Sequence, residues 1–230
     1  FTVTHPYSII TKYIPNGSLY DALHQKPGSP VLTSTDKTKI ALCIAKGMQD
    51  LHELSTIHCE LKSLNVLLDE DLLPKICDSG ISRFKNNKDS IITKQIGTPH
   101  WMAPEMFEST NYTNKVDVYA YGMLLWELET CEAPFKGFTA AQVCMVICKN
   151  KARPSVPNSL PESLIELITK CWSHVPEERP TFEEVYKEIV EKKAFYNGTD
   201  IDEINAFVAN MEKINKRETE KPEKSEESFS

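Results

Sequence analysis

One stretch of this sequence has apolar side chains on every side of a helix. Asp117 is followed by VYAYGMLLWEL, residues 118–128, and a helix of this kind lies either in a globular core or in a membrane. The longest nearly apolar run, 118–126, is far shorter than the roughly 20 residues that cross a bilayer. We therefore expect no transmembrane segment but a buried central helix, around which 230 residues with 40% hydrophobic side chains can build one large domain or two small domains.

The rest of the hydrophobic pattern is mostly helical. Apolar residues recur every three or four positions from Ile40 to Leu51, which predicts a helix of about 19 residues with Ser34 or Thr35 as its N-cap. Further helices are expected at 143–147, 164–171 and 182–190, and an amphipathic one within 194–211. Short β-branched and aromatic runs predict strands at 7–14, 66–68 and 74–77. These patterns indicate a mainly α fold with a few short strands.

Composition limits the partners and the compartment. Thirty-three acidic against 26 basic residues give a net charge of −7, which argues against nucleic acid or an anionic membrane surface as the main partner. The seven cysteines are scattered and odd in number, which disfavours a disulfide framework and favours a reducing, cytoplasmic compartment. Segment 212–230 has 11 charged residues among 19 and is expected to be a disordered tail.

Three short motifs carry the chemistry. The loop HCELKSLN, residues 58–65, holds a carboxylate, an ammonium and an amide, and Asp78-Ser79-Gly80 adds a second carboxylate 13 residues later. Phosphoryl transfer needs a carboxylate to orient the attacking hydroxyl, a lysine near the moving phosphoryl group and oxygen ligands for magnesium. The third motif is GTPHWMAPE, residues 97–105. The residue types of these motifs match that chemistry.

In order and spacing, the three motifs resemble the protein kinase catalytic loop HRDxKxxN, the magnesium loop DFG and the segment GTxxxxAPE. The resemblance covers roughly 2–190 and corresponds to the large C-terminal lobe of a kinase. The tryptophan of GTPHWMAPE and the YAYGMLLWEL helix resemble the tyrosine-kinase-like group, in which Lys62 and Thr98 indicate serine/threonine specificity. The resemblance divides the chain into an N-lobe remnant (1–14), a kinase C-lobe (15–193), the amphipathic helix (194–211) and the tail (212–230).

The resemblance also implies roles for individual residues. It implies ATP and Mg²⁺ as cofactors, a protein as substrate or binding partner, and Asp117 and the Glu105–Arg179 pair as anchors of the fold. Asp117 would cap the central helix and brace the catalytic loop. The site residues it implies are Glu60, Lys62 and Thr98 for catalysis; Thr11 as gatekeeper with Lys12, Tyr13, Ile14 and the floor residue Leu67 for adenine; and Asn65 and Asp78 for the metal.

Several positions depart from the family pattern. Glu60 stands where the family has its catalytic aspartate, Cys59 replaces the arginine that reads a phosphate on the activation loop, and Ser79 replaces the phenylalanine of DFG. The sequence opens with Phe1 rather than Met and on a strand-like segment, so we expect it to start at a truncation. No glycine-rich loop or strand lysine precedes Thr11. Nucleotide binding is expected to be very weak, and the adenine floor at 66–68 is expected to be exposed.

Three functions remain open at this point. The chain is a catalytically impaired pseudokinase or interaction module, the C-lobe of an active serine/threonine kinase whose N-lobe is missing, or a decayed gene product. His58 is expected to be structural, and His52 and His58 are not expected to bind a metal. Ser90 and Thr93 are candidate phosphorylation sites. Upstream sequence with a glycine-rich loop would favour the active kinase.

Overall fold

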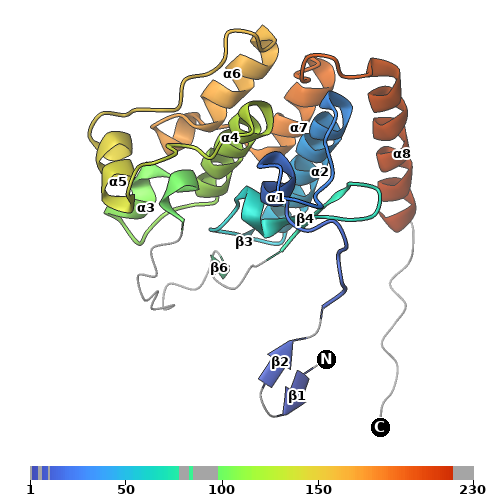
Figure 1. Cartoon of the computed structure of the whole chain (residues 1–230), viewed down its shortest axis with the longest axis horizontal. Coiled ribbons are helices and arrows are strands. Elements are labelled where there is room, and N and C mark those ends of the chain that lie inside the picture. Colours follow the sequence, from blue (N-terminus) through green and yellow to red (C-terminus); the bar gives the residue numbers. More distant parts are fainter. Residues whose placement is uncertain (1, 5–6, 10, 78–82, 85–97, 220–230) are drawn as a thin grey trace.

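The computed structural model describes residues 2–4, 7–9, 11–77, 83–84 and 98–219, with side chains placed in 11–77 and 98–214. The described part is mainly helical with short strands, as the sequence predicts (Figure 1). The strands are β1 (Thr2–Thr4), β2 (Tyr7–Ile9), β3 (Thr56–Ile57), β4 (Val66–Leu68), β5 (Pro74–Ile76) and β6 (Arg83–Phe84). The helices are α1 (Leu19–Leu23), α2 (Ser34–Glu53), α3 (Pro104–Glu108), α4 (Lys115–Thr130), α5 (Ala140–Cys148), α6 (Glu162–Cys171), α7 (Phe182–Glu191) and α8 (Ile201–Thr219).

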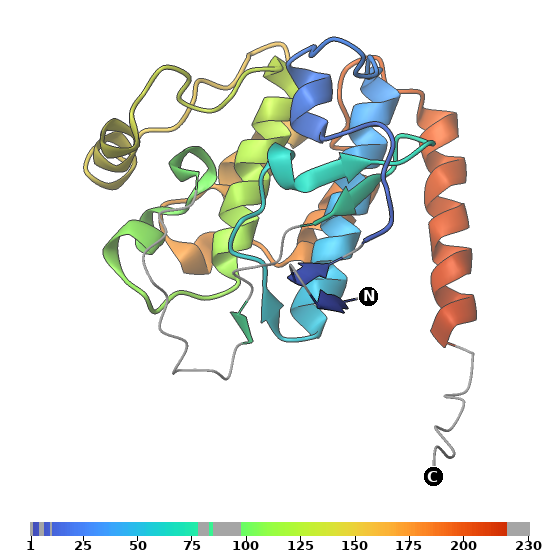
Figure 2. The same ribbon diagram turned by 60° about the horizontal axis from the view of Figure 1, so that its bottom comes forward.

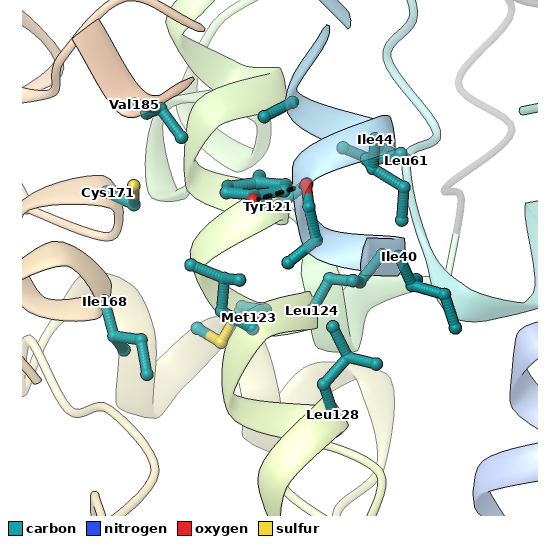
Figure 3. Close-up of a cluster of buried hydrophobic side chains, with 14 of the residues drawn as sticks. Ile40, Ile44, Leu61, Tyr121, Met123, Leu124, Leu128, Ile168, Cys171 and Val185 are labelled. Carbon is teal, nitrogen blue, oxygen red and sulfur yellow. Dashed lines mark hydrogen bonds between the residues drawn. The ribbon is translucent and has the colours of Figure 1, made fainter. Parts of the chain in front are cut away.

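Helix α4 is the centre of the fold, as its sequence predicts. Every residue from Val116 to Leu128 is buried, which is possible because α2 packs on one side and α6 on another. At Gly122, the backbone of α4 comes so close to α6 that an added Cβ would lie 2.9 Å from Cβ of Cys171. The Tyr121 hydroxyl donates a hydrogen bond of 2.9 Å to the carbonyl of Ala41 in α2 (Figure 3). Close packing therefore fixes α4 against α6, and one buried hydrogen bond fixes α4 against α2.

Helix α2 has the length and apolar face that its periodicity predicts, but its N-cap is Thr33 rather than Ser34 or Thr35. Thr33 Oγ1 accepts from the backbone of Asp36 at 3.1 Å, and the Asp36 carboxylate accepts from the backbone of Thr33 at 2.9 Å. This reciprocal capping box satisfies two N–H groups, which a cap at Ser34 would not do here. Helices α7 and α8 pack against α2.

The strands form three two-stranded antiparallel pairs, β1–β2, β3–β6 and β4–β5. The predicted strand at 7–14 is too long, because β2 ends at Ile9 and residues 11–14 are not in a strand. The expected exposure of the floor at 66–68 is also wrong in part. Val66 and Leu68 are fully buried and only Leu67 is half-buried, because neighbouring side chains of a strand point to opposite faces.

Helix α8 packs along one edge of the body (Figure 2). Ile204 and Val208 of α8 are buried, and Thr199 and Tyr196 just before the helix both bind Thr38 of α2. The expected disordered tail at 212–230 is wrong for its first part, since α8 continues to Thr219. Glutamate, lysine and arginine are good helix formers, so a high charge alone does not end the helix. Residues 220–230 lie outside the described part of the chain. Across the ranges the structure describes, no helix is both long and apolar enough to cross a bilayer.

Candidate active site

The loop with the candidate catalytic residues is held by Asp117 of α4. The buried Asp117 carboxylate accepts hydrogen bonds of 2.8 Å from the backbone N–H groups of His58 and Cys59 and from Nε2 of His52. Cys59 has a φ of 68°, a left-handed conformation that is strained for a residue with a side chain. Asp117 therefore stabilises a strained loop, as the resemblance implied. It does not cap its own helix, which begins two residues earlier at Lys115.

His58 has both ring nitrogens engaged within the fold. Nδ1 accepts from the backbone N–H of Glu60 at 3.2 Å, and Nε2 lies 3.1 Å from the carbonyl oxygen of Cys77. Because a carbonyl can only accept, Nε2 carries the proton in the neutral ring. These contacts agree with the structural role expected for His58. His52 likewise bonds Asp117, and the described residues contain no group of three side chains suited to a metal ion.

Three of the predicted site residues lie together. Nζ of Lys62 is 3.5 Å from Oε2 of Glu60 and donates a hydrogen bond of 2.9 Å to Oγ1 of Thr98. The side chains of Lys62 and Glu60 are only 14% and 17% exposed, so their attraction is screened less than that of a surface pair. With Trp101 and neighbouring residues they line a cavity of about 10 Å³, room for about one water molecule or one hydroxyl group.

The predicted metal ligands are only partly within the described chain. Asn65 is buried, and its Nδ2 donates 2.9 Å to the backbone carbonyl of Glu60. That bond fixes the amide and leaves Oδ1 as the atom suited to a metal, since Mg²⁺ prefers oxygen ligands. The chemistry of Asn65 therefore fits Mg²⁺. Asp78 lies outside the described residues, as do Ser79, Ser90 and Thr93.

The predicted adenine-binding residues lie outside the catalytic loop, four of them in the segment before α1 and Leu67 in β4. Thr11, Lys12 and Tyr13 are exposed, Tyr13 at 81%, while Ile14 is half-buried. The chain that follows them is attached to β4 by two backbone hydrogen bonds, from Asn16 N–H to Leu68 O (3.2 Å) and from Leu68 N–H to Gly17 O (2.9 Å). This attachment brings the half-buried Leu67 next to the segment after Ile14.

Sequence reasoning missed the polar residues that support this loop from the core. His24, Ser63 and Trp101 each form a hydrogen bond with the carboxylate of Glu127. Only Glu127 gave a local signal, as a lone carboxylate inside an apolar helix. The sequence also gives no sign that His52 bonds Asp117, as it does in the structure.

Comparison with known proteins identifies the class. The model of the protein tyrosine and serine/threonine kinase family matches residues 1–189. A probable serine/threonine-protein kinase of Dictyostelium discoideum is 46% identical over 176 residues, which is 76% of this chain and 19% of that protein. Serine/threonine-protein kinase STY46 of Arabidopsis thaliana is 37% identical over 183 residues, 80% of this chain and 31% of that protein. Serine/threonine-protein kinase TNNI3K of Mus musculus is 40% identical over 189 residues, 80% of this chain and 22% of that protein.

The chain thus belongs to the protein kinase family. Within it, the chain is of the tyrosine-kinase-like serine/threonine type and corresponds to the C-lobe part of a kinase domain. It spans about a fifth to a third of the length of these three relatives. Residues 190–219, which include all of α8, lie beyond the family match.

Proposed function

We propose that this chain is a serine/threonine kinase lobe in which phosphoryl transfer is impaired, and that it acts as a pseudokinase or interaction module. The observation that carries the proposal is the position of the Glu60 carboxylate. Glutamate is one methylene longer than the aspartate of the family, which displaces the carboxylate by about 1 Å, enough to cost roughly 10²-fold in a positioned reaction. Its Oε2 also lies 3.5 Å from Nζ of Lys62.

The family reaction explains why this contact matters. The acceptor hydroxyl attacks the γ-phosphorus of ATP, the bond from that phosphorus to the bridging oxygen breaks, and the hydroxyl proton passes to the carboxylate. In this site the carboxylate is Glu60, and Lys62 would face the transferred group. A glutamate that pairs with Lys62 neutralises the charge that should stabilise the phosphoryl oxygens. Both residues are then less available for transfer.

The cofactors belong to the same proposal. Asn65 would hold Mg²⁺ through Oδ1 together with Asp78, and Thr11, Lys12, Tyr13, Ile14 and Leu67 would contact the adenine. Bound Mg²⁺ supplies positive charge to the phosphates. Asn65 is suited to its part because the hydrogen bond to Glu60 O orients its amide. The half-buried Leu67 offers only a small apolar contact area, which agrees with weak nucleotide binding.

A second candidate, an active serine/threonine kinase, is favoured by one specific contact. Lys62 donates to Thr98 at 2.9 Å, so the catalytic loop and the segment before the APE motif are already joined. Glu60 would then serve adequately as the carboxylate. The two candidates differ only in whether Glu60 limits turnover.

One experiment separates the two candidates. The full-length protein is assayed with ATP, Mg²⁺ and a generic protein substrate, alongside its Lys62→Ala and Glu60→Asp variants. We expect wild-type turnover close to that of Lys62→Ala, and a gain of roughly 10²-fold in Glu60→Asp. Turnover far above Lys62→Ala, with no gain from Glu60→Asp, would instead establish the active kinase.

The proposal also includes a protein partner and a cytoplasmic location. Protein is the substrate class of the family, and the net charge of −7 disfavours nucleic acid. Five of the cysteines are free thiols, namely Cys43, Cys131, Cys144, Cys148 and Cys171, which suits a reducing compartment.

A further inference from the structure

Glu127, in the middle of α4, connects three separate segments around the candidate active site. Its side chain is fully buried. Oε1 accepts a hydrogen bond of 2.7 Å from Oγ of Ser63 and lies 3.2 Å from Nε2 of His24, while Oε2 accepts 3.0 Å from Nε1 of Trp101. His24 follows α1, Ser63 belongs to the catalytic loop, and Trp101 follows Thr98 in the segment before the APE motif.

The hydrogen bonds of Glu127 connect the same two segments as the hydrogen bond between Lys62 and Thr98 in the candidate active site. Lys62 and Thr98 are joined by one hydrogen bond, and their near neighbours Ser63 and Trp101 are joined through the Glu127 carboxylate. The same two segments are therefore linked twice. A buried carboxylate is costly unless it is hydrogen-bonded, and a leucine would fill this core position without that cost. A leucine, however, could not accept hydrogen bonds from both segments, as the two carboxylate oxygens of Glu127 do.

We propose that Glu127 is a positioning residue, which fixes the Thr98–Trp101 segment relative to Lys62 and thereby sets how a protein acceptor is held. The effect of Glu127 on acceptor binding rests on the proposed kinase function. The predicted adenine-binding residues form no hydrogen bond with Glu127. Loss of the Glu127 carboxylate should therefore raise the Michaelis constant for the protein acceptor more than that for ATP.

The first test does not depend on phosphoryl transfer. Amide hydrogen exchange is followed by mass spectrometry in the full-length protein and in its Glu127→Gln variant, which keeps the size of the side chain but not its charge or both acceptors. The peptide covering 98–103 contains the backbone bonds from Trp101 N–H to Thr98 O and from Met102 N–H to Pro99 O. We expect its exchange to become about tenfold faster, the loss expected for one hydrogen bond to a charged group.

The controls separate positioning from general instability. Peptides of α6, a helix that contains none of the hydrogen-bond partners of Glu127, should exchange at the wild-type rate. Glu129→Gln makes the same substitution in the same helix at a half-buried position and should change neither region. Equal acceleration in α6 and in 98–103, or no acceleration in 98–103, overturns the inference whatever the turnover of the protein.

The second test asks about the acceptor. In a Glu60→Asp background, the Michaelis constant for the protein substrate should rise at least about fivefold on adding Glu127→Gln, while that for ATP stays within about twofold. A fall in kcat with both constants unchanged would show loss of folded protein and contradict the role in acceptor binding. If Glu60→Asp itself gives no turnover, Glu60 is not what limits phosphoryl transfer and that part of the proposed function fails, whereas the exchange result still decides the positioning of the segment.

Discussion

Arg179 and Glu105 form a bidentate ion pair between the loop before α7 and helix α3. Nη1 of Arg179 lies 2.6 Å from Oε1 of Glu105, and Nη2 lies 2.9 Å from Oε2. The guanidinium is 1% exposed, its Nε donates to the carbonyl of Ser173 at 2.9 Å, and it lies over the ring of Tyr119. This pair is the fold anchor that the resemblance implied.

Removal of one partner should therefore be costly. Glu105→Gln leaves a buried guanidinium without its counter-charge, and we expect a loss of about 3 kcal/mol in the free energy of unfolding, measured by urea denaturation. The control is Lys187→Gln, which breaks the exposed Glu183–Lys187 pair and should lower the free energy of unfolding far less, because solvent screens that pair. A loss below about 1 kcal/mol in Glu105→Gln would show that the pair is not an anchor.

Asp117→Asn should loosen the catalytic loop. The carboxylate accepts three hydrogen bonds, whereas the amide places a donor opposite one of those N–H groups. We expect a loss of about 2 kcal/mol and faster amide exchange at His58 and Cys59, followed by mass spectrometry. Asp50→Asn, on the exposed Lys46–Asp50 pair, is the matched control. Unchanged exchange at 58–59 would contradict the bracing role.

The stability contributed by Glu127 should fall as pH rises. Burial raises the pKa of Glu127 above its ordinary value of 4.5, although hydrogen bonds from His24, Ser63 and Trp101 oppose the shift. A raised folded-state pKa means that the contribution is complete below pH 4.5 and is lost as pH rises through the folded-state value. Glutamine does not titrate, so the wild-type free energy of unfolding should decline relative to Glu127→Gln over this range.

The measurement is urea unfolding of both proteins at several values from about pH 4 to about pH 8. Because His24 is a second ionisable side chain in contact with Glu127, the comparison is repeated in a His24→Gln background. A difference between the two proteins that stays constant or grows in favour of wild type with rising pH would contradict the raised pKa.

Most helices could be predicted from the sequence because their burial is local and periodic. The apolar stripes of α2, α6 and α7 each face the core, and the all-round apolar pattern of α4 matches its burial on every side. The strand at 7–14 was predicted too long because β-propensity does not reveal where a pairing partner ends. The sequence places the start of the disordered tail too early, at 212, because a pattern of charges does not distinguish a solvated helix from a disordered chain.

The proximity of site residues could be predicted from the sequence only for residues that belong to the same motif. Glu60, Lys62 and Asn65 share one loop, and their proximity follows from it. The Glu127 network joins residues that are 26, 64 and 103 positions apart, and no local pattern encodes such pairings. Asp78 remains a prediction, because it lies outside the described residues.

Helix α8 should stabilise the lobe although it lies beyond the family match. Ile204 is 1% exposed against the body, whereas Ile214 on the same helix is 55% exposed. Ile204→Ala should cost about 2–4 kcal/mol, and Ile214→Ala less than about 0.5 kcal/mol, both measured by urea unfolding. Equal, small effects of the two substitutions would mean that α8 is not part of the cooperative unit.

Two glycines inside helices, Gly122 and Gly47, have neighbours of different mobility. A Cβ at Gly122 of α4 would lie 2.9 Å from Cβ of Cys171 and 3.1 Å from the backbone nitrogen of Trp172, atoms that cannot move without shifting α6. A Cβ at Gly47 of α2 would meet only the flexible end of Ile76, at 3.3 Å. Alanine is the better helix former by about 1 kcal/mol, so the same substitution has opposite consequences at the two positions.

Gly122→Ala should therefore lower the free energy of unfolding by about 1–3 kcal/mol through overpacking, whereas Gly47→Ala should leave it unchanged or raise it by up to about 1 kcal/mol. Urea denaturation of both variants measures the two effects. Cys171→Ala cannot relieve the clash, because alanine keeps the Cβ, but Cys171→Gly in the Gly122→Ala background removes the atom in contact. Partial recovery of stability in that double variant, relative to Cys171→Gly alone, would locate the strain at the α4–α6 contact. Purely additive losses would place its cause elsewhere.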